Sequence, residues 1–585
     1  MNTLYYGDNL NVLRESIKDE SVDLIYLDPP FNSKRDYNVL FKSRKGQSSD
    51  AQIVAFEDSW HWGPQAEREF AEILHSRNTD VAEMMQALRS FLNENDVLAY
   101  LTMMANRLLE LHRVLKITGS LYLHCDPTAS HYLKFVLDAV FGKENFRNEI
   151  AWKRTYSHGS AHKWGDVHDT IFFYTKSGDY TWNKITQDYD DSYLETKYRF
   201  TDAHGTYRLV VLTGMGTSQG DSGKPWRGYN PTEAGRHWTV PQRALNALIS
   251  EGVAVPPTLL DQLELLYQHD YIRFPKKADG STGVPEFKLY LGEGAPIQDV
   301  ITDIPPINSQ AAERLGYPTQ KPIALLERII RASSNIGDIV LDPFCGCGTA
   351  VHAAQKLGRA WSGIDITHLA ISLIEKRLKG AFPGIKFEVV GTPTDFDGAR
   401  DLADRDKYQF QWWACSLVDA QPYQGKKKGA DTGIDGLIFF EDEKGSAKRV
   451  IVSVKGGENV GVSMLKDLIA TVQREKAAVG LFVTLTKPTR PMTIEAASAG
   501  FYESPMGVSY PRIQILTVEG LMNGSERPAY PLSQSGGLTF KRTKVEVRNT
   551  RQAGLFEARR VASDLASLPL SAFVPPPKHN EDAET

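Results

Sequence analysis

The chain has 585 residues, of which 41% are hydrophobic and 24% charged, and its formal net charge is -5. This length favours about three to four domains, and the net charge does not by itself indicate a nucleic-acid-binding protein. The four cysteines are scattered, and the C-x-C at Cys345 and Cys347 lacks the second pair that a structural zinc site needs. We find no charged-then-apolar leader and no apolar run near the ~18 residues of a membrane span, so we expect a cytoplasmic protein without a membrane partner.

A short apolar run near the start, Val22–Leu27, predicts a strand buried on both faces of a sheet. The next four residues are Asp28, Pro29, Pro30 and Phe31, and the prolines fix φ and remove two backbone donors. The turn therefore presents acceptors that can hold both hydrogens of an exocyclic amine and favour a reactive, tetrahedral nitrogen. Phe31 offers an apolar face on which a flipped base can stack. The same pattern also fits an ordinary strand-to-loop turn.

The segments that follow suit a protein that meets DNA. Residues 45–95 indicate an insertion that forms either a lid or a DNA-facing loop. Between Trp152 and about Asn308 the apolar periodicity weakens, and aromatic residues mix with polar and basic ones. Three histidines in this region lack a compact ligand set and do not define a zinc site; they are His158, His162 and His168. The basic clusters suited to phosphate are Lys34-Arg35, Lys42 with Arg44-Lys45, Lys153-Arg154 and Lys426-Lys427-Lys428.

A regular apolar pattern returns after Pro322, a suitable first residue for a helix. One face of the predicted helix carries four apolar residues, which are Leu325, Leu326, Ile329 and Ile330. Gly337 is expected to end the helix. We expect this helix to support the turn that comes next.

A second apolar strand, Asp338–Leu341, leads into the glycine-rich turn Asp342–Thr349, which has the sequence D-P-F-C-G-C-G-T. Gly346 and Gly348 let the backbone pass close to a ligand, and the residues after them begin a predicted helix. The turn lacks the lysine of a phosphate-binding loop. The next strand, Trp361–Asp365, ends in an acid at the point where a Rossmann-like sheet holds a ribose diol. The pattern therefore indicates a cofactor that contains a nucleoside.

These motifs together resemble the permuted beta group of DNA amino-methyltransferases, in which the catalytic D-P-P-[YF] precedes the S-adenosylmethionine turn D-P-F-x-G-x-G-T. The ordered matches span most of residues 1–395. Further matching stretches are Tyr6-Gly7-Asp8-Asn9, Arg113-Val114-Leu115, Gly119-Ser120-Leu121-Tyr122-Leu123-His124-Cys125-Asp126, Asn148-Glu149-Ile150-Ala151-Trp152-Lys153 and Tyr317-Pro318-Thr319-Gln320-Lys321-Pro322. The resemblance implies an α/β fold, a permuted Rossmann-like class I methyltransferase sheet with an inserted recognition lobe.

The resemblance also implies an activity and a set of site residues. The activity is methyl transfer from S-adenosylmethionine to the exocyclic amine of a flipped base in double-stranded DNA. Adenine N6 is favoured because D-P-P goes more often with adenine in this family, and cytosine N4 is the alternative. The implied catalytic turn is Asp28 to Phe31, with Phe31 where many relatives carry tyrosine. The implied cofactor contacts are Asp8, Thr319, Lys321, Asp342, Phe344, Gly346, Gly348, Thr349 and Asp365.

A second module is expected to begin near Ala399. Its first predicted helix carries Tyr408, Phe410, Trp412 and Trp413. An acid, Asp435, and a lysine, Lys455, stand at successive predicted strands, the layout of nucleases that bind Mg²⁺ through carboxylates. The stretch resembles the Mrr-type restriction endonuclease domain, which implies Asp435 as a metal ligand and Asp435, Ser453 and Lys455 as the site. It departs from that pattern at Ser453, where the superfamily has Glu or Gln. It departs again on the leading helix, where an acid is expected and Gln411 is the nearest candidate.

These departures leave the role of the second module open. It either cleaves unmethylated DNA with Mg²⁺, which makes the protein a bifunctional restriction-modification enzyme, or it only binds DNA. Expected partners are double-stranded DNA and either a second copy of the chain or other restriction-modification or defence subunits. The expected domains are a catalytic half at 1–154, a recognition region at 155–308, a cofactor half at 309–395, a nuclease-like domain at 399–536 and a mostly disordered tail at 537–585.

Overall fold

The computed structural model describes residues 2–30, 36–42, 48–57, 61–156, 164–278, 280, 282–292, 294–308, 311, 313–315, 317, 319–423, 433–443, 446–531, 539–540 and 543–546. Several predictions concern residues outside these ranges and stay predictions. These residues are Phe31, Lys34, Arg35, Arg44, Lys45, His158, His162, Pro318, the lysines at 426–428 and most of the expected tail, and the side chain of Lys42 is likewise not described. In the part of the chain described, no helix is long and apolar enough to cross a membrane.

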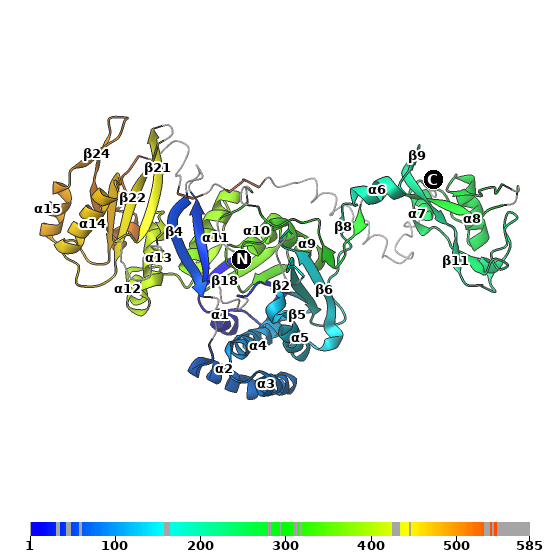
Figure 1. Ribbon diagram of the computed structural model, residues 1–585, viewed down its shortest axis with the longest axis horizontal. Helices are drawn as coiled ribbons and strands as arrows, with labels where there is room; N and C mark the ends of the chain where they lie inside the picture. Colours follow the sequence, from blue (N-terminus) through cyan, green and yellow to red (C-terminus); the bar gives the residue numbers. More distant parts are fainter. Residues whose placement is uncertain are drawn as a thin grey trace, which may run out of the picture. The chain divides into compact units, whose positions relative to one another are not determined.

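A mixed nine-stranded sheet, counted over the described residues, has the order β16-β6-β7-β5-β2-β17-β18-β1-β19. Figure 1 labels four of its strands, β2, β5, β6 and β18. β7 runs antiparallel to β5 and β6, and the other neighbours pair in parallel. The strands are β1 (Thr3–Tyr6), β2 (Val22–Leu27), β5 (Leu115–Cys125), β6 (Phe146–Lys153), β7 (His168–Thr175), β16 (Val300–Ile301), β17 (Ile339–Asp342), β18 (Ala360–Asp365) and β19 (Glu388–Val390). Because β2 lies beside β17, early and late parts of the chain form one α/β sheet, as the sequence predicted.

Helices cover both faces of this sheet, which is why most residues of its central strand β2 are apolar and buried. Alternate residues of β2 point to opposite faces: Ile25 and Leu27 pack into one core, and Leu24 and Tyr26 pack into the other. The helices of the first core are α1 (Asn9–Ser16), α2 (Pro64–Leu74), α3 (Thr79–Leu92), α4 (Asp96–Val114) and α5 (Pro127–Phe141). Those of the second core are α9 (Ile323–Ser333), α10 (Thr349–Lys356) and α11 (His368–Ala381).

The helix predicted after Pro322 is α9, and Pro322 stands at its N-cap. Its four predicted core residues are all buried; they are Leu325, Leu326, Ile329 and Ile330. The helix ends at Ser333, earlier than predicted, because Ser334 is extended and its carbonyl accepts a hydrogen bond from Arg359. Gly337, with φ of +90°, lies in the turn before β17.

The expected insertion at 45–95 contains α2, α3 and the second strand of an antiparallel hairpin, β3 (Asp36–Lys42) with β4 (Ser48–Glu57). Residues 184–298 form a compact unit of their own, inside the range 155–308. This unit has its own core around the buried Trp238. Its elements are β8 (Thr186–Gln187), α6 (Asp191–Lys197), β9 (Phe200–Asp202), β10 (Gly205–Val211), β11 (Thr213–Met215), β12 (Arg236–Trp238), α7 (Gln242–Ser250), α8 (Leu259–Gln268), β13 (Ile272–Arg273), β14 (Glu286–Tyr290) and β15 (Ala295–Pro296).

A second sheet follows in the order β20-β21-β22-β23-β26. Its strands are β20 (Gln421–Pro422), β21 (Gly436–Glu443), β22 (Ser446–Lys455), β23 (Val479–Thr484) and β26 (Ile513–Thr517). The elements around it are α12 (Phe396–Arg405), α13 (Lys407–Leu417), α14 (Val462–Arg474), α15 (Arg490–Ser498), α16 (Val518–Asn523) and the hairpin of β24 (Phe501–Glu503) and β25 (Ser509–Pro511). The predicted aromatic helix is α13, in which Phe410, Trp412 and Trp413 are buried and Tyr408 is exposed.

Candidate active site

A cavity of about 210 Å³ lies where β1, β2, β17 and β18 end. This is the edge at which open α/β sheets bind their ligands. The predicted residues that line it are Asp8, Asp28, Pro29, Pro30, Thr319, Lys321, Asp342, Phe344, Gly346, Thr349 and Asp365. The lining also includes Tyr26, Arg107 and Tyr317, which the sequence analysis did not assign to the site. The two predicted turns therefore share one cavity.

The two carboxylate oxygens of Asp28 differ in their contacts. Its Oδ2 pairs with Nζ of Lys321, and the two side chains are only 15% and 9% exposed. Its Oδ1 is buried and has no hydrogen-bond partner among the described residues. Leaving a buried acceptor unsatisfied costs roughly 1–3 kcal/mol, so this oxygen suits a ligand that brings an N–H donor.

The glycine-rich turn comes close to the cavity because two of its residues adopt left-handed backbone conformations. Gly346 has a φ of +51°, and a Cβ there would lie 3.2 Å from Cε1 of Tyr317. Gly348 has a φ of +74°, and a Cβ there would lie 2.8 Å from Cγ1 of Ile374 on α11. Gly348 caps α10 and packs on α11, so it shapes the turn without lining the cavity.

Asp365 at the end of β18 is held by the backbone around it. One oxygen accepts the Gly346 N–H at 2.8 Å, and the other accepts the N–H and the hydroxyl of Thr367, each at 2.9 Å. These contacts fix the orientation of the carboxylate on the cavity wall. Burial raises the pKa of Asp365 to about 6. The acid is therefore mostly ionised at neutral pH and becomes protonated just below it.

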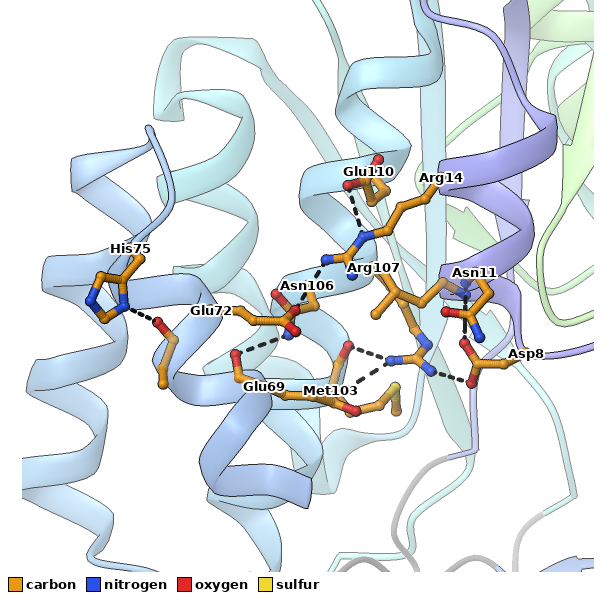
Figure 2. A network of polar contacts seen from close by, with 12 residues as sticks. Asp8, Asn11, Arg14, Glu69, Glu72, His75, Met103, Asn106, Arg107 and Glu110 are labelled. Carbon is orange, nitrogen blue, oxygen red and sulfur yellow. Dashed lines mark hydrogen bonds and ion pairs between the residues drawn. The ribbon is translucent and has the colours of Figure 1, made fainter. Parts of the chain in front are cut away.

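Asp8 connects the first strand with a buried arginine (Figure 2). Its Oδ1 accepts the Leu10 N–H at 2.8 Å and caps α1, while its Oδ2 pairs with Arg107 on α4 at 2.9 Å. Arg107 also donates from Nε to Oδ1 of Asn9 at 2.5 Å, and Asn9 donates to the Pro343 carbonyl at 2.8 Å. These contacts tie the first strand to the glycine-rich turn. A single arginine within the apolar stretch of α4 was the signal that could have predicted this role.

Burial also changes the pKa of an acid at the start of the glycine-rich turn. It raises the pKa of Asp342 well above its usual value, and the nearby charge of Asp28 raises it further. Asp342 accepts the Phe344 N–H at 3.1 Å, a contact that holds the start of the turn.

Among the described residues, no group of three or more His, Cys, Asp or Glu side chains is arranged to hold a metal ion.

The expected nuclease residues lie together in the second sheet. Asp435 receives hydrogen bonds from Gln411 Nε2, from Ser453 Oγ at 3.3 Å and from the Val454 N–H at 2.6 Å. Lys455 Nζ lies 3.8 Å from the same carboxylate. These donors occupy both oxygens of Asp435, and a hydroxyl replaces the second carboxylate that a Mg²⁺ site needs. The described residues therefore do not fit a resident Mg²⁺ ion.

Helix α13 also contacts the walls of the cavity. Trp412 packs in one buried cluster with Tyr317, Cys347, Leu369 and Leu373. The neighbouring Gln409 accepts the first N–H of α11 at 3.0 Å through its Oε1. One helix of the second module thus supports the glycine-rich turn and α11.

Comparison with known proteins assigns the larger part of the chain. Residues 22–376 match the N6/N4 family described as DNA methylase. The chain belongs to this DNA methylase family. Residues 416–523 match a separate family described as NACHT-associated inactive Restriction Endonuclease 1.

Two similar proteins are a methyltransferase and a subunit of a restriction-modification enzyme. Type II methyltransferase M.EcaI of Enterobacter cloacae is 32% identical over 282 residues, which are 48% of this chain and 57% of that protein. The Mod subunit of the type III restriction-modification enzyme StyLTI of Salmonella typhimurium is 25% identical over 383 residues, 62% of this chain and 51% of that protein. The chain thus spans between half and three fifths of these relatives.

Two solved structures are also similar to parts of the methylase. The M1.HpyAVI complex with S-adenosylmethionine is 14% identical, with a TM-score of 0.29, and covers 65% of this chain and 99% of that one. The cytosine-N4-specific PvuII DNA methyltransferase is 13% identical, with a TM-score of 0.27, and covers 64% and 86%.

Proposed function

We propose that this methylase transfers a methyl group from S-adenosylmethionine to the exocyclic amine of a flipped base in double-stranded DNA. The observation that carries the proposal is the buried Oδ1 of Asp28, an acceptor without a partner among the described residues. It lies in the same cavity as the glycine-rich turn and Asp365. An amine acceptor and a nucleoside-binding turn in one cavity suit methyl transfer to a base amine better than either feature alone.

The residues that would hold the cofactor come from several turns. Asp365 lies on the cavity wall, where its carboxylate would accept a ribose hydroxyl, and Gly346 lets the backbone approach. The other proposed contacts on the cavity wall are Asp8, Thr319, Lys321, Asp342, Phe344 and Thr349. Gly348 supports the turn through its packing on α11. When bound, S-adenosylmethionine supplies the electrophilic methyl group.

The chain's own residues prepare the amine. Oδ1 of Asp28 accepts one N–H of the amine, and the Pro29 carbonyl is placed by its ring to accept the other, which draws the nitrogen lone pair out of conjugation. The ammonium of Lys321 pairs with Oδ2 and limits the rotation of the carboxylate. Phe31 is the proposed stacking face for the base.

We favour adenine N6 as the target because this chain carries D-P-P at the catalytic turn, and cytosine N4 is the alternative. Residues 184–298 are the proposed recognition lobe of a permuted methyltransferase domain. Expression in a host that lacks methylation, followed by sequencing that detects modified bases, reports the base, the site and the activity together. Modified cytosine without modified adenine would overturn the adenine assignment.

For the second module we favour DNA binding without cleavage. Two observations support this: both oxygens of the Asp435 carboxylate accept hydrogen bonds, and the matching family is described as inactive. The alternative is a bifunctional enzyme that cleaves unmethylated DNA with Mg²⁺. Partner subunits are also a proposal, since one similar protein is a Mod subunit of a type III restriction-modification enzyme.

A further inference from the structure

Four polar side chains lie in a line across four neighbouring strands at the edge that carries the catalytic turn. They are Tyr26 on β2, His124 on β5, Asp169 on β7 and Arg154 directly after β6, and the sheet order is β6-β7-β5-β2. We call these four residues the edge line. The Tyr26 hydroxyl is 2.9 Å from His124 Nδ1, and His124 Nε2 is 3.1 Å from Asp169 Oδ2. Arg154 Nε is 3.2 Å from Asp169 Oδ1, so each strand contributes one member.

Three members of the edge line are almost completely buried. Tyr26 is 2% exposed, His124 is 0% exposed and Asp169 is 2% exposed. Burying such groups is costly unless they are fully hydrogen-bonded, and well-packed apolar side chains would stabilise a sheet at least as well. Packing alone therefore does not explain the edge line. Arg154 differs, because its side chain is 37% exposed.

The direction of the hydrogen bonds follows from the charges. Burial, together with the charge of Lys321, lowers the pKa of His124, so the imidazole is neutral at physiological pH. Burial raises the pKa of Asp169, but the hydrogen bond from His124 and the charges of Lys321 and Arg154 lower it by more, so this acid is ionised. A neutral imidazole has one donor and one acceptor. His124 therefore donates from Nε2 to Asp169 and accepts the hydroxyl of Tyr26 at Nδ1.

One end of the edge line reaches the cavity and the other reaches the surface. Tyr26 lines the same cavity as Asp28, which follows it by two residues in the chain. At the other end, Arg154 has a guanidinium whose planar fork of N–H groups matches phosphate oxygens. The ion pair between its Nε and Asp169 Oδ1 holds the group beside this carboxylate. Lys153 precedes it and adds a second positive charge.

We infer that the edge line is a positioning device that connects a DNA phosphate, bound by Arg154, to the catalytic turn. Asp169, His124 and Tyr26 then fix the end of β2, and so fix where Asp28 meets the target amine. The line holds geometry and does not take the proton that the amine loses. This inference rests on the proposed methyl transfer.

Tyr26→Phe tests the inner end, because it removes one hydroxyl and keeps the ring. We expect kcat of the full-length protein on DNA to fall roughly 10- to 100-fold, the usual cost of a small misplacement of a reacting group. The Kd for S-adenosylmethionine and the KM for DNA should stay within about twofold of wild type, a pattern that a general loss of stability would not produce. Asp169→Asn should lower kcat in the same way.

Tyr122→Phe is the matched control. Tyr122 pairs in register with Tyr26 on the adjacent strand, is equally buried at 2% exposure, and donates or accepts a hydrogen bond at 2.7 Å with Ser333. It is outside the edge line and the cavity wall. Its loss removes an equivalent buried hydroxyl, so kcat should stay within about twofold. If the wild type methylates DNA and the two variants have equal kcat values, the inference is overturned and the proposed function still stands.

Arg154→Gln tests the outer end and keeps the inference open to refutation if Tyr26→Phe unfolds. The slope of log Kd for DNA against log salt concentration should become shallower by about the amount that one phosphate contact contributes. An unchanged slope would overturn the phosphate contact. A wild-type chain that binds S-adenosylmethionine but transfers no methyl group to any DNA would instead overturn the proposed function, and the inference with it.

Discussion

The ammonium of Lys321 lies against Oδ2 of Asp28, although the two residues are separated by 293 positions in the chain. The contact joins the strand that carries the catalytic turn to the segment that leads into the glycine-rich turn. It leaves Oδ1 of the same carboxylate buried and available to a donor. The acid and its partner therefore form a single feature of the site.

Replacing Asp28 with alanine should abolish most methyl transfer and leave the Kd for S-adenosylmethionine within a few-fold of wild type. Losing one preorganised polar group typically costs roughly 10²–10³ in rate. Asp23 provides a matched control on the same strand, because it pairs with Lys116 at 2.8 Å and does not line the cavity. Asp23→Ala should lower the melting temperature and retain the rate. Near wild-type transfer by Asp28→Ala in a filter assay with labelled cofactor would refute the assigned role.

The affinity for S-adenosylmethionine should depend on pH through Asp365. Its pKa is raised to about 6 by burial, so the ionised form that accepts a ribose hydroxyl dominates above pH 6 and is lost below it. Affinity should be constant from neutral to alkaline pH and roughly tenfold weaker one unit below the pKa. Calorimetric titration across this range measures it.

Two variants check that Asp365 is the group responsible. Asp365→Asn should show weaker binding with little change between neutral and acidic pH. Asp365→Ala should weaken binding by about 1–3 kcal/mol, the range for losing a charged hydrogen-bond acceptor. A wild-type affinity that does not change with acidification would place the ribose contact elsewhere.

Helix α13 should affect cofactor binding from outside the methylase sheet. Trp412→Ala removes the side chain that packs with Tyr317 and Cys347, and we expect weaker S-adenosylmethionine binding together with a lower melting temperature. Trp413→Ala is the control, because Trp413 packs in the core of the second module. It should destabilise that module, at a cost of roughly 3–5 kcal/mol, and change cofactor affinity less than Trp412→Ala. If both variants bind the cofactor equally well, the packing of Trp412 against Tyr317 and Cys347 does not affect cofactor binding.

The second module should not cleave DNA. Full-length protein incubated with unmethylated plasmid and Mg²⁺ should leave the plasmid supercoiled, because the carboxylate of Asp435 already accepts hydrogen bonds from Gln411 and Val454. Premethylated plasmid, chelator and the Lys455→Ala variant are the controls. Nicking that needs Mg²⁺ and disappears in Lys455→Ala would show instead that the module is a working nuclease. DNA binding measured by anisotropy should persist in all of these conditions.

Local features of the sequence predicted several of the elements that surround the cavity. The run Val22–Leu27 is β2, and the turn after it lines the cavity. The glycines of the second turn have the positive φ values that such a turn requires. These features were predictable because strand periodicity, proline and glycine act over a few residues. The end of α9 was misplaced, because an extended Ser334 stops the helix before Gly337 does.

Short-range patterns in the sequence pointed to the residues proposed to carry the chemistry: an acid before two prolines, a glycine-rich turn and an acid at the end of the next strand. The partners of these residues came from the tertiary structure, which places Lys321 beside Asp28, Arg107 beside Asp8 and three hydrogen-bond donors around Asp435. The physical reason is that turns and strands follow from short-range backbone preferences, whereas contacts between distant residues depend on strand order and register. A one-residue change in register would turn each of these side chains to the other face of its sheet.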